Sequence, residues 1–522
     1  MTDSRTVGFI DVGTNSIHVL VSKFYPDSLG TPIYHDKESV RLGQSLFSLG
    51  YIDEETVKRS QLVISNFVRV AKDMGAEEIF AYATSAAREA YNRSEILDAA
   101  SSAGIDLKII TGKEEARLTG LGVFGPYGPP DRCLLFDLGG GSTEINLSKG
   151  TEVLYLDSMV AGSVRFSFGM GIDQLEKVKK EDYDFMRKEV RKLAKKSVKK
   201  VKGIGFDSAM GSSGTLVNLA KMCAARRSDG DPSYMTLKEL SSLMADLCDM
   251  TEVQRRSVPR IDGGRSDIII GGGAIAEELM TLFEVNTIYI SDSGLREGMQ
   301  VEYLMESGSK DFNLRSSSVN NLARRCHTNL KHSEQVKTMA LRLFDGFKEE
   351  GLHNMDDRDR SILGYASTLH DIGEFISYNR HNVHTYTIIT NSNLPGFNPE
   401  ELEDMALIAS FHHRKFPSRN NKHLRRMNAE RVDNIRMSAL FLRIADVLDR
   451  HRSSNVEEMD GEVKKNCFII TLKSEEDLNM EVWKLQELSE AFEDVLGLKL
   501  RICASGWGET INVPEIGTRK VS

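Results

Sequence analysis

Over roughly the first 300 residues, segments with apolar side chains at strand-like spacing alternate with segments at helical spacing. Residues 6–24, TVGFIDVGTNSIHVLVSKF, predict two strands around a small-residue turn, because apolar side chains dominate both arms. Residues 55–75 instead carry apolar side chains at helical spacing and end at a glycine, which suits a helix C-cap. Strand-like and helix-like segments keep alternating as far as residue 306, which is typical of α/β domains.

Two stretches of this alternating region start alike. Residues 9–21, FIDVGTNSIHVLV, and residues 135–147, LFDLGGGSTEINL, each place an Asp at the end of an apolar strand, then small residues, then a second strand. Such a repeat predicts a duplicated α/β core with a cleft between its halves. Glycines and prolines cluster at 125–131, where we expect the linker between the halves.

The pattern changes near residue 312, where helical spacing repeats in segment after segment up to about residue 455. Beyond that point the chain returns to short strand-like runs around one helix. The whole chain of 522 residues is too long for one hydrophobic core. We therefore predict two α/β domains, an all-α domain and a small α+β domain, at 1–124, 125–311, 312–455 and 456–522.

The two similar stretches contain the first candidate functional residues. Asp11 leads the loop DVGTNS, and Asp137 leads the loop DLGGGSTE. Glycines let a phosphate approach the main chain, and backbone N–H groups and hydroxyls can then donate to it. An Asp beside bound phosphates suits Mg²⁺, which prefers carboxylate and phosphate oxygen. A single loop could be an ordinary tight turn, but two matching loops predict a phosphate cleft, and neither is a Walker A motif.

A third candidate lies at residues 112–117, GKEEAR, where a strand ends and a helix begins. Glu114 and Glu115 fall in the first helical turn. Acids there can simply offset the helix dipole. Between two phosphate loops, however, one of these carboxylates could orient and deprotonate a water molecule.

Composition narrows the class of protein. The formal net charge is −9, which argues against a protein that coats nucleic acid. The six cysteines form no CxxC pair, as expected in a reducing compartment. The chain shows no signal peptide and no apolar run long enough for a membrane span, so we expect a cytoplasmic protein without membrane or nucleic-acid partners.

Basic residues are nevertheless concentrated at 187–202, RKEVRKLAKKSVKKVK, on what should be one face of an amphipathic helix. This face is either a solvated surface or an electrostatic guide for a polyanion. Basic residues at 413–415 and 424–426 could extend such a path.

Six motifs in this order resemble the exopolyphosphatase/guanosine pentaphosphate phosphatase (Ppx/GppA) family: DVGTNS, TSAAREA, TGKEEARL, DLGGGSTE, GSSGT and SDSGLREG. The resemblance implies a duplicated ribonuclease H-like (actin-like ATPase) core, Glu115 as the catalytic base, and Mg²⁺ near Asp137 and Glu144, with Asp11 beside it. The implied phosphate-binding residues are Gly13, Thr14, Asn15, Ser16, Arg88, Gly139, Gly140, Gly141, Ser142, Thr143 and Gly214. The GSSGT loop could face a nucleoside or be a turn. The family also implies a homodimer, the commonest symmetric assembly.

The helical block has a pattern of its own. His332, the pair His370-Asp371, and Asp446 occur in the order H…HD…D, which resembles the HD phosphohydrolase superfamily. The resemblance implies a second divalent metal held by these four residues. Two further pairs, His381/His384 and His412/His413, fall between them. Buried histidines are also common structural residues, so the alternative is a helical domain without metal.

Together these features predict an enzyme that hydrolyses the terminal phosphoanhydride of inorganic polyphosphate with Mg²⁺. The alternative within the same cleft is removal of the 5′ γ-phosphate of guanosine pentaphosphate. More remote alternatives are a phosphate-binding regulator without turnover and a sugar or acid kinase of the same fold. The extra domains after residue 311 favour the long polymer.

Overall fold

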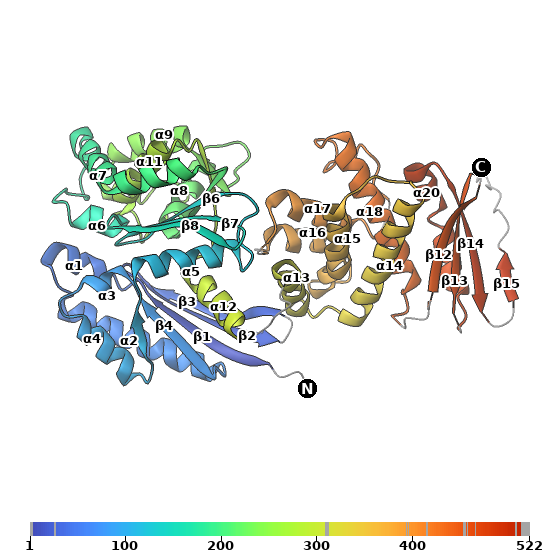
Figure 1. The fold of residues 1–522 in the computed structure, drawn as a ribbon, viewed down its shortest axis with the longest axis horizontal. Helices are drawn as coiled ribbons and strands as arrows, with labels where there is room; N and C mark the ends of the chain where they lie inside the picture. Colours follow the sequence, from blue (N-terminus) through green and yellow to red (C-terminus); the bar gives the residue numbers. More distant parts are fainter. Residues whose placement is uncertain are drawn as a thin grey trace. The chain divides into compact units, whose positions relative to one another are not determined.

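The structure is a computed structural model, and it describes residues 4–25, 28–307, 313–392, 394, 396–413, 416–452, 456, 458–464, 466–474, 476–506 and 509–512. The chain forms two compact units, one ending at Leu314 and the other beginning at Arg315, which we call unit 1 and unit 2. Each unit is described by itself (Figure 1).

Unit 1 contains two sheets that share a five-strand topology, and the second sheet adds β10 at its edge. The first has the order β3-β2-β1-β4-β5, and the second has the order β10-β11-β9-β6-β7-β8. In both, the first three strands are antiparallel neighbours and the next two join in parallel. This repeat confirms the predicted duplicated ribonuclease H-like core of the actin-like ATPases. The strands are β1 (Arg5–Val12), β2 (Ile17–Tyr25), β3 (Ser28–Glu38), β4 (Glu78–Ala83), β5 (Leu107–Ile109), β6 (Cys133–Leu138), β7 (Thr143–Lys149), β8 (Glu152–Met159), β9 (Ser208–Ser212), β10 (Tyr234–Thr236) and β11 (Thr287–Ile290).

The helices of unit 1 cover both sheets. Those that follow the first sheet are α1 (Leu42–Leu49), α2 (Glu54–Asp73), α3 (Ser85–Glu89), α4 (Arg93–Ser102) and α5 (Gly112–Phe124). Those that follow the second are α6 (Ser163–Phe168), α7 (Lys180–Ile204), α8 (Gly214–Ala224), α9 (Leu237–Cys248), α10 (Glu252–Arg255), α11 (Ile269–Phe283) and α12 (Leu295–Glu306).

The predicted boundary at 311 lies close to the end of unit 1 at Leu314. Two helices cross between the halves of unit 1, and here the predicted boundary at 124/125 does not follow the packing. Helix α5 belongs to the first half in sequence but packs on β7 and β8, whereas α12 ends the second half but packs on β1 and β3. The two helices also pack on each other along the boundary between the halves (Figure 1). A Cβ atom on Gly122 would lie 2.1 Å from the carbonyl oxygen of Gly294, so glycine permits this close crossing.

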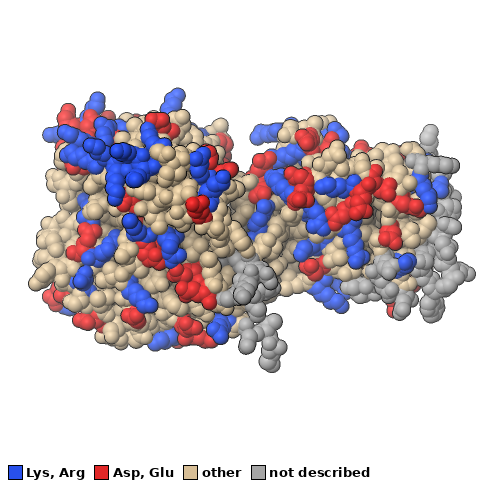
Figure 2. Space-filling view, viewed as in Figure 1, with Lys and Arg blue, Asp and Glu red and all other residues tan. Residues whose placement is uncertain are grey.

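The basic segment forms α7, as predicted, with Val190, Ala194 and Val201 buried against the second half. Lys and Arg side chains gather over this helix in Figure 2. Arg191 pairs with the buried Glu278 at 2.7 Å, so part of the basic face is already neutralised. Of the basic groups expected to extend it, residues 414 and 415 lie outside the described part of the chain.

Unit 2 begins with helices and ends with a sheet of order β12-β13-β14-β15. The elements are α13 (Leu314–Arg325), α14 (Leu330–Glu349), α15 (Asp357–Leu369), the 3₁₀ helix η1 (Ile372–Phe375), α16 (His381–Asn391), α17 (Pro399–Ser410), α18 (Ala429–Leu448), β12 (Glu458–Lys464), β13 (Cys467–Lys473), α19 (Asn479–Gln486), α20 (Ser489–Leu496), β14 (Lys499–Gly506) and β15 (Glu509–Asn512).

The predicted boundary at 456 does not separate two cores. Phe347 on α14 stacks near Phe468 on β13, with ring centroids 4.2 Å apart, and near Phe492 on α20, at 6.1 Å. One continuous cluster of buried apolar residues therefore joins the helices to the sheet. The end of the chain also has two helices, α19 and α20, where the sequence predicted one. Among the described residues, no helix is long and apolar enough to cross a membrane.

Candidate active site

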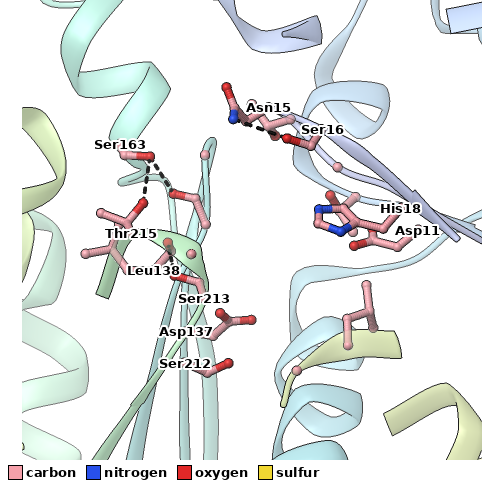
Figure 3. Close-up of a pocket in the computed structure, with 18 of the residues that line it drawn as sticks. Asp11, Asn15, Ser16, His18, Asp137, Leu138, Ser163, Ser212, Ser213 and Thr215 are labelled. Atoms are coloured by element: carbon pink, nitrogen blue, oxygen red, sulfur yellow. Dashed lines mark hydrogen bonds between the residues drawn. The ribbon is translucent and has the colours of Figure 1, made fainter. Parts of the chain in front are cut away.

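The two loops predicted to hold phosphate face one cleft of unit 1, with a volume of about 290 Å³. The cleft lies where β1 turns into β2 and β6 turns into β7, and the turns after β9 and β11 complete it. Figure 3 shows Asp137, Ser212 and Ser213 on one wall, facing Asp11, Ser16 and His18 on the other. Small residues and carboxylates thus converge from both halves of the duplicated core.

The two loops fit together through glycine. A Cβ atom on Gly141 would lie 2.4 Å from Ser85 Oγ and 2.8 Å from Thr14 Oγ1. A Cβ atom on Gly140 would also meet Thr14, at 3.0 Å. The first loop can therefore approach the second only because these positions lack a side chain, and the approach leaves main-chain groups lining the cleft.

The turn after β9 is the third small-residue loop. Ser213 holds a left-handed backbone with φ of 89° and donates its hydroxyl to the carbonyl of Leu138 at 2.6 Å. Such a conformation is costly outside glycine and is common at functional sites. Gly214 then opens α8, and a Cβ atom there would lie 2.0 Å from the guanidinium of Arg265. Gly214 therefore allows a cation to lie against the start of the helix.

Four carboxylates come together: Asp11, Glu115 and Asp137 line the cleft, and Glu144 is buried beside them. Thr119 donates to Asp137 at 3.0 Å, and Ser158 donates to Glu144 at 2.8 Å. Two oxygens of the cluster, Asp11 Oδ1 and Glu144 Oε2, are buried without a hydrogen-bond partner among the described residues.

The pKa values of all four carboxyl groups are raised. Burial raises the pKa of Asp11 to about 7 and that of Asp137 to about 6. Burial and the nearby Asp137 raise the pKa of Glu144 to about 8. Burial, followed by the charge of Glu144, raises the pKa of Glu115 well above its usual value, against the opposing effect of Arg88. The nearby positive charge is therefore too small to keep all four carboxyl groups ionised.

This donor set fits Mg²⁺. Hard divalent cations prefer oxygen ligands, and a cation beside buried carboxylates stabilises their charged forms. Asp11, Asp137 and Glu144 would hold the ion, and the unpartnered oxygens of Asp11 and Glu144 are available to it. Bound there, Mg²⁺ would neutralise charge on the phosphates.

The structure separates the two adjacent glutamates on α5. Glu115 lines the cleft and is 8% exposed. Glu114 points elsewhere, where Arg117 donates to it at 2.6 and 2.9 Å and lowers its pKa. Thr111 caps the helix by accepting from the backbone N–H of Glu114 at 3.2 Å, which fixes the direction of both side chains. Of the two glutamates, Glu115 alone lines the cleft.

Most of the predicted phosphate-binding residues line the cleft, but two do not. The lining includes Gly13, Thr14, Asn15, Ser16, Gly139, Gly140, Gly141, Ser142 and Gly214. Arg88 instead donates to the carbonyl of Ile110 at 2.8 Å and to Glu115 at 3.3 Å, so it positions the carboxylate. The hydroxyl of Thr143 donates to the carbonyl of Ala161 at 2.6 Å in the interior.

Four nitrogen-bearing side chains in the same cleft were missed by the sequence reasoning: His18, Lys37, Arg265 and Arg296. Burial, with the charges of Arg296 and Lys37, lowers the pKa of His18 well below its usual value. A signal for His18 existed, because the β1–β2 hairpin pairs it with Asp11. Arg265 and Arg296 come from segments far along the chain, and no local pattern marks them.

The predicted metal ligands of unit 2 also meet. His332 Nε2 and His370 Nε2 lie 3.6 and 3.5 Å from Asp446 Oδ1. The same nitrogens lie 3.8 and 3.5 Å from Asp371 Oδ2. His381, His412 and His413 lie beside this group, although the sequence reasoning did not assign them to it.

Two family models match the chain. The model of the Ppx/GppA phosphatase family matches residues 24–307, and that of Ppx/GppA phosphatase domain III matches residues 314–490. The chain belongs to the Ppx/GppA phosphatase family. The family match runs from the end of β2 to α12, so it includes the second loop and Glu115 but not the first loop at 11–16, and domain III corresponds to most of unit 2.

Solved structures of Ppx/GppA proteins share the fold. An exopolyphosphatase from Cytophaga hutchinsonii is 24% identical with a TM-score of 0.52, over 59% of this chain and 100% of that chain. The Aquifex aeolicus family member is 22% identical with a TM-score of 0.50, over 58% of this chain and 99% of that chain. An exopolyphosphatase-like protein is 24% identical with a TM-score of 0.53, over 58% and 98%.

Proposed function

We propose that the cleft of unit 1 hydrolyses the terminal phosphoanhydride of inorganic polyphosphate and releases orthophosphate. The observation that carries the proposal is Glu115, a buried carboxylate of raised pKa at the base of a cleft lined by two glycine loops. Its family membership makes the chain a phosphatase. The similar solved structures include an exopolyphosphatase and an exopolyphosphatase-like protein, which agrees with the proposed substrate.

The residues have separate roles in this proposal. The backbone N–H groups and hydroxyls of the two loops hold the last phosphates of the chain. Glu115 accepts a proton from water as the water oxygen bonds to the terminal phosphorus, and the P–O bond to the bridging oxygen breaks. A base whose pKa lies near the working pH suits this task. Mg²⁺ held by Asp11, Asp137 and Glu144 supplies charge neutralisation. Positioning and electrostatics carry most of phosphoryl transfer.

The cleft lining favours a polymer over a nucleotide. Among the described residues that line the cleft, His18 is the only one with an aromatic ring, and the apolar ones are Leu138, Val217 and Leu295. A nucleobase is usually bound between apolar or aromatic surfaces. Hydroxyl-bearing residues and glycines dominate instead, with Lys37, Arg265 and Arg296 among them, which suits a chain of phosphates. Guanosine pentaphosphate remains the second candidate, because its 5′ end presents the same terminal phosphoanhydride.

Orthophosphate release tests the proposal when four substrates are compared side by side with Mg²⁺: long-chain polyphosphate, guanosine pentaphosphate, ATP and pyrophosphate. We expect the highest kcat/KM for polyphosphate. A higher value for guanosine pentaphosphate would make the second candidate the function of this cleft. Release from none of them would contradict catalysis and leave the phosphate-binding regulator. The Glu115→Gln protein serves as the background control in each assay.

A further inference from the structure

One helix of unit 1 carries a row of lysines that does not belong to the cleft. Four exposed lysines of α7 follow one another at intervals of three or four residues: Lys188, Lys192, Lys195 and Lys199. We call this row the lysine ridge. At about 3.6 residues per turn the four fall on one stripe of the helix, opposite the buried Val190, Ala194 and Val201. Among the described residues, those that line the cleft include none of α7.

The basic residues of α7 divide into two groups. Arg187 and Arg191 donate to the fully buried Glu278 at 3.0 and 2.7 Å, so these two arginines fasten the helix to α11. The ridge differs, because three of its four lysines have no acidic partner among the described residues. The fourth, Lys192, pairs with Glu189 on the same helix. The positive charge of the ridge is therefore hardly compensated by the protein itself.

The spacing of the ridge is unfavourable for the helix alone. Residues three and four apart are neighbours on a helix surface, so each ammonium group of the ridge lies near another. Like charges at this spacing repel each other and destabilise a helix. A polyanion laid along the ridge offsets this repulsion and is attracted by every ammonium group. The ridge therefore has the properties of a binding surface for negative charge.

The shape of the surface fits a thin, linear ligand. At a rise of about 1.5 Å per residue, the ridge from Lys188 to Lys199 is about 16 Å long. A groove of about 540 Å³ lies against the same helix and is lined by residues between Asp184 and Lys195. Figure 2 shows how densely Lys and Arg side chains gather over α7. A single row of positive charges matches a chain that carries negative charge on every unit.

We propose that the lysine ridge is a second binding site for inorganic polyphosphate, separate from the cleft that hydrolyses the end of the chain. The inference rests on the proposed function, which makes polyphosphate a ligand of this protein. A chain held at the ridge and in the cleft gains affinity from both sites, because the second contact is intramolecular. Phosphates that do not react thus keep the polymer at the enzyme while its end is shortened.

Two other polyanions fit the ridge less well. Proteins that bind single-stranded nucleic acid usually stack its bases on aromatic side chains, and residues 187–202 contain no aromatic side chain. Lysine also lacks the flat, forked guanidinium that reads base edges. Helices that bind membranes insert an apolar face, whereas Val190, Ala194 and Val201 of α7 are buried inside unit 1.

Binding of end-labelled polyphosphate to the full chain, followed by fluorescence anisotropy, tests the site. All proteins carry Glu115→Gln, so that the polymer is not degraded during the measurement. The ridge variant replaces the four lysines of the ridge by glutamine, which is also a good helix former. The control variant replaces four exposed lysines on other elements of unit 1 by glutamine: Lys72, Lys108, Lys221 and Lys238. Both variants change the net charge of the chain equally.

We expect the ridge variant to bind long chains about tenfold or more weakly than the control variant. Tripolyphosphate is too short to meet the whole ridge, so its affinity should differ much less between them. The slope of log affinity against log salt should become shallower by roughly 3 for long chains, since each lysine bound to phosphate releases counterions. Thermal unfolding should show the ridge variant to be as stable as the control. Equal losses of long-chain affinity in both variants would mean that only overall charge matters, and would overturn the proposal.

Two further ligands distinguish polyphosphate from other polyanions. Labelled single-stranded RNA and vesicles of phosphatidylserine and phosphatidylcholine are tested for direct binding at equal phosphate concentration. We expect polyphosphate to bind most tightly. Tighter binding of RNA or of vesicles that only the ridge variant loses would assign the ridge to nucleic acid or to a membrane, and would overturn the proposal. Orthophosphate release takes no part in these measurements, so a failure of the ridge and a failure of the proposed function are separate results.

Discussion

The cleft of unit 1 and the His/Asp cluster of unit 2 gather ionisable side chains in different ways. In unit 1 the candidate ligands are carboxylates only, and they lie on the adjacent ends of strands β1, β6 and β7. In unit 2 imidazoles outnumber carboxylates, and helices supply them as single side chains. Oxygen-only ligands suit Mg²⁺, and imidazoles suit transition metals. The two sites therefore differ mainly in their ligand atoms: oxygen alone in unit 1, and nitrogen together with oxygen in unit 2.

The two sites also depend on different residue types for their shape. Glycines allow the loops of unit 1 to touch, so main-chain groups line the cleft. Carbonyl acceptors at the ends of helices orient the rings in unit 2. A change that disturbs the backbone should therefore harm unit 1 most, whereas a change that removes a side chain should harm unit 2.

The largest expected effect is on the base of unit 1. Glu115→Gln keeps the size of the side chain but cannot accept a proton, so we expect turnover on polyphosphate to fall about 10²–10⁴-fold. Glu114→Gln is the matched control and should stay close to the unchanged protein, because Glu114 pairs with Arg117 outside the cleft. Steady-state orthophosphate release measures both. A larger loss in Glu114→Gln would reverse the assignment within the pair. The metal content of unit 2 should not change in either variant.

The next largest effect concerns the loops. Gly141→Ala would place a Cβ atom against Ser85 and Thr14, so the loops must separate and kcat/KM should fall about 10–100-fold. Gly346→Ala, on α14 of unit 2, meets nothing within 4 Å and should stabilise the helix by up to about 1 kcal/mol. Steady-state kinetics measures the loss of activity in Gly141→Ala, and thermal unfolding measures the gain of stability in Gly346→Ala. If Gly141→Ala retains full activity, close contact between the loops is not needed.

A smaller effect is expected on the metal requirement. Asp137→Asn removes one negative charge from the cluster, so the Mg²⁺ concentration for half-maximal activity should rise at least about tenfold. Transition-metal content of unit 2 should stay the same. Activity titrated against Mg²⁺ measures the Mg²⁺ requirement, and elemental analysis measures the transition-metal content. An unchanged Mg²⁺ dependence with lower maximal activity would argue against a metal role for Asp137.

The smallest effect is a shift in stability with pH. Folding raises the pKa of Asp137, Asp11 and Glu144 to about 6, 7 and 8, above the value of about 4 in an unfolded chain. The folded state therefore binds more protons, and its stability falls as pH rises through this window. With a chelator, calorimetry should show unit 1 unfolding at lower temperature at pH 8 than at pH 6. Added Mg²⁺ should reduce the difference. The opposite sign would mean that these carboxyl groups bind fewer protons in the folded protein than in the unfolded chain.

The sequence predicted the parts of the structure that local patterns encode. Two Asp-led loops indicated a duplicated core, and the second sheet repeats the five-strand order of the first, with β10 added at its edge. The histidines and aspartates of the helical block indicated a shared site, and four of them meet. In each case the spacing of residues along a strand or helix carries the information.

The parts that failed depend on packing between distant segments. Helices α5 and α12 each pack on the sheet of the other half, so the domain boundary drawn at 124/125 does not follow the contacts. Arg265 and Arg296 reach the cleft from segments with no local signal. Arg88 and Thr143 matched the family motifs, yet their side chains are used in internal hydrogen bonds. A motif gives a position in the chain but not the direction of a side chain.

One measurement tests the central claim most directly: where heavy oxygen from labelled water appears when the protein degrades polyphosphate with Mg²⁺. The proposed mechanism places the water oxygen on the terminal phosphorus, so each released orthophosphate should carry one labelled oxygen by mass spectrometry. The remaining polymer should carry none. Label on the shortened polymer with unlabelled orthophosphate would mean attack on the neighbouring phosphorus. Absence of orthophosphate release would contradict the account outright.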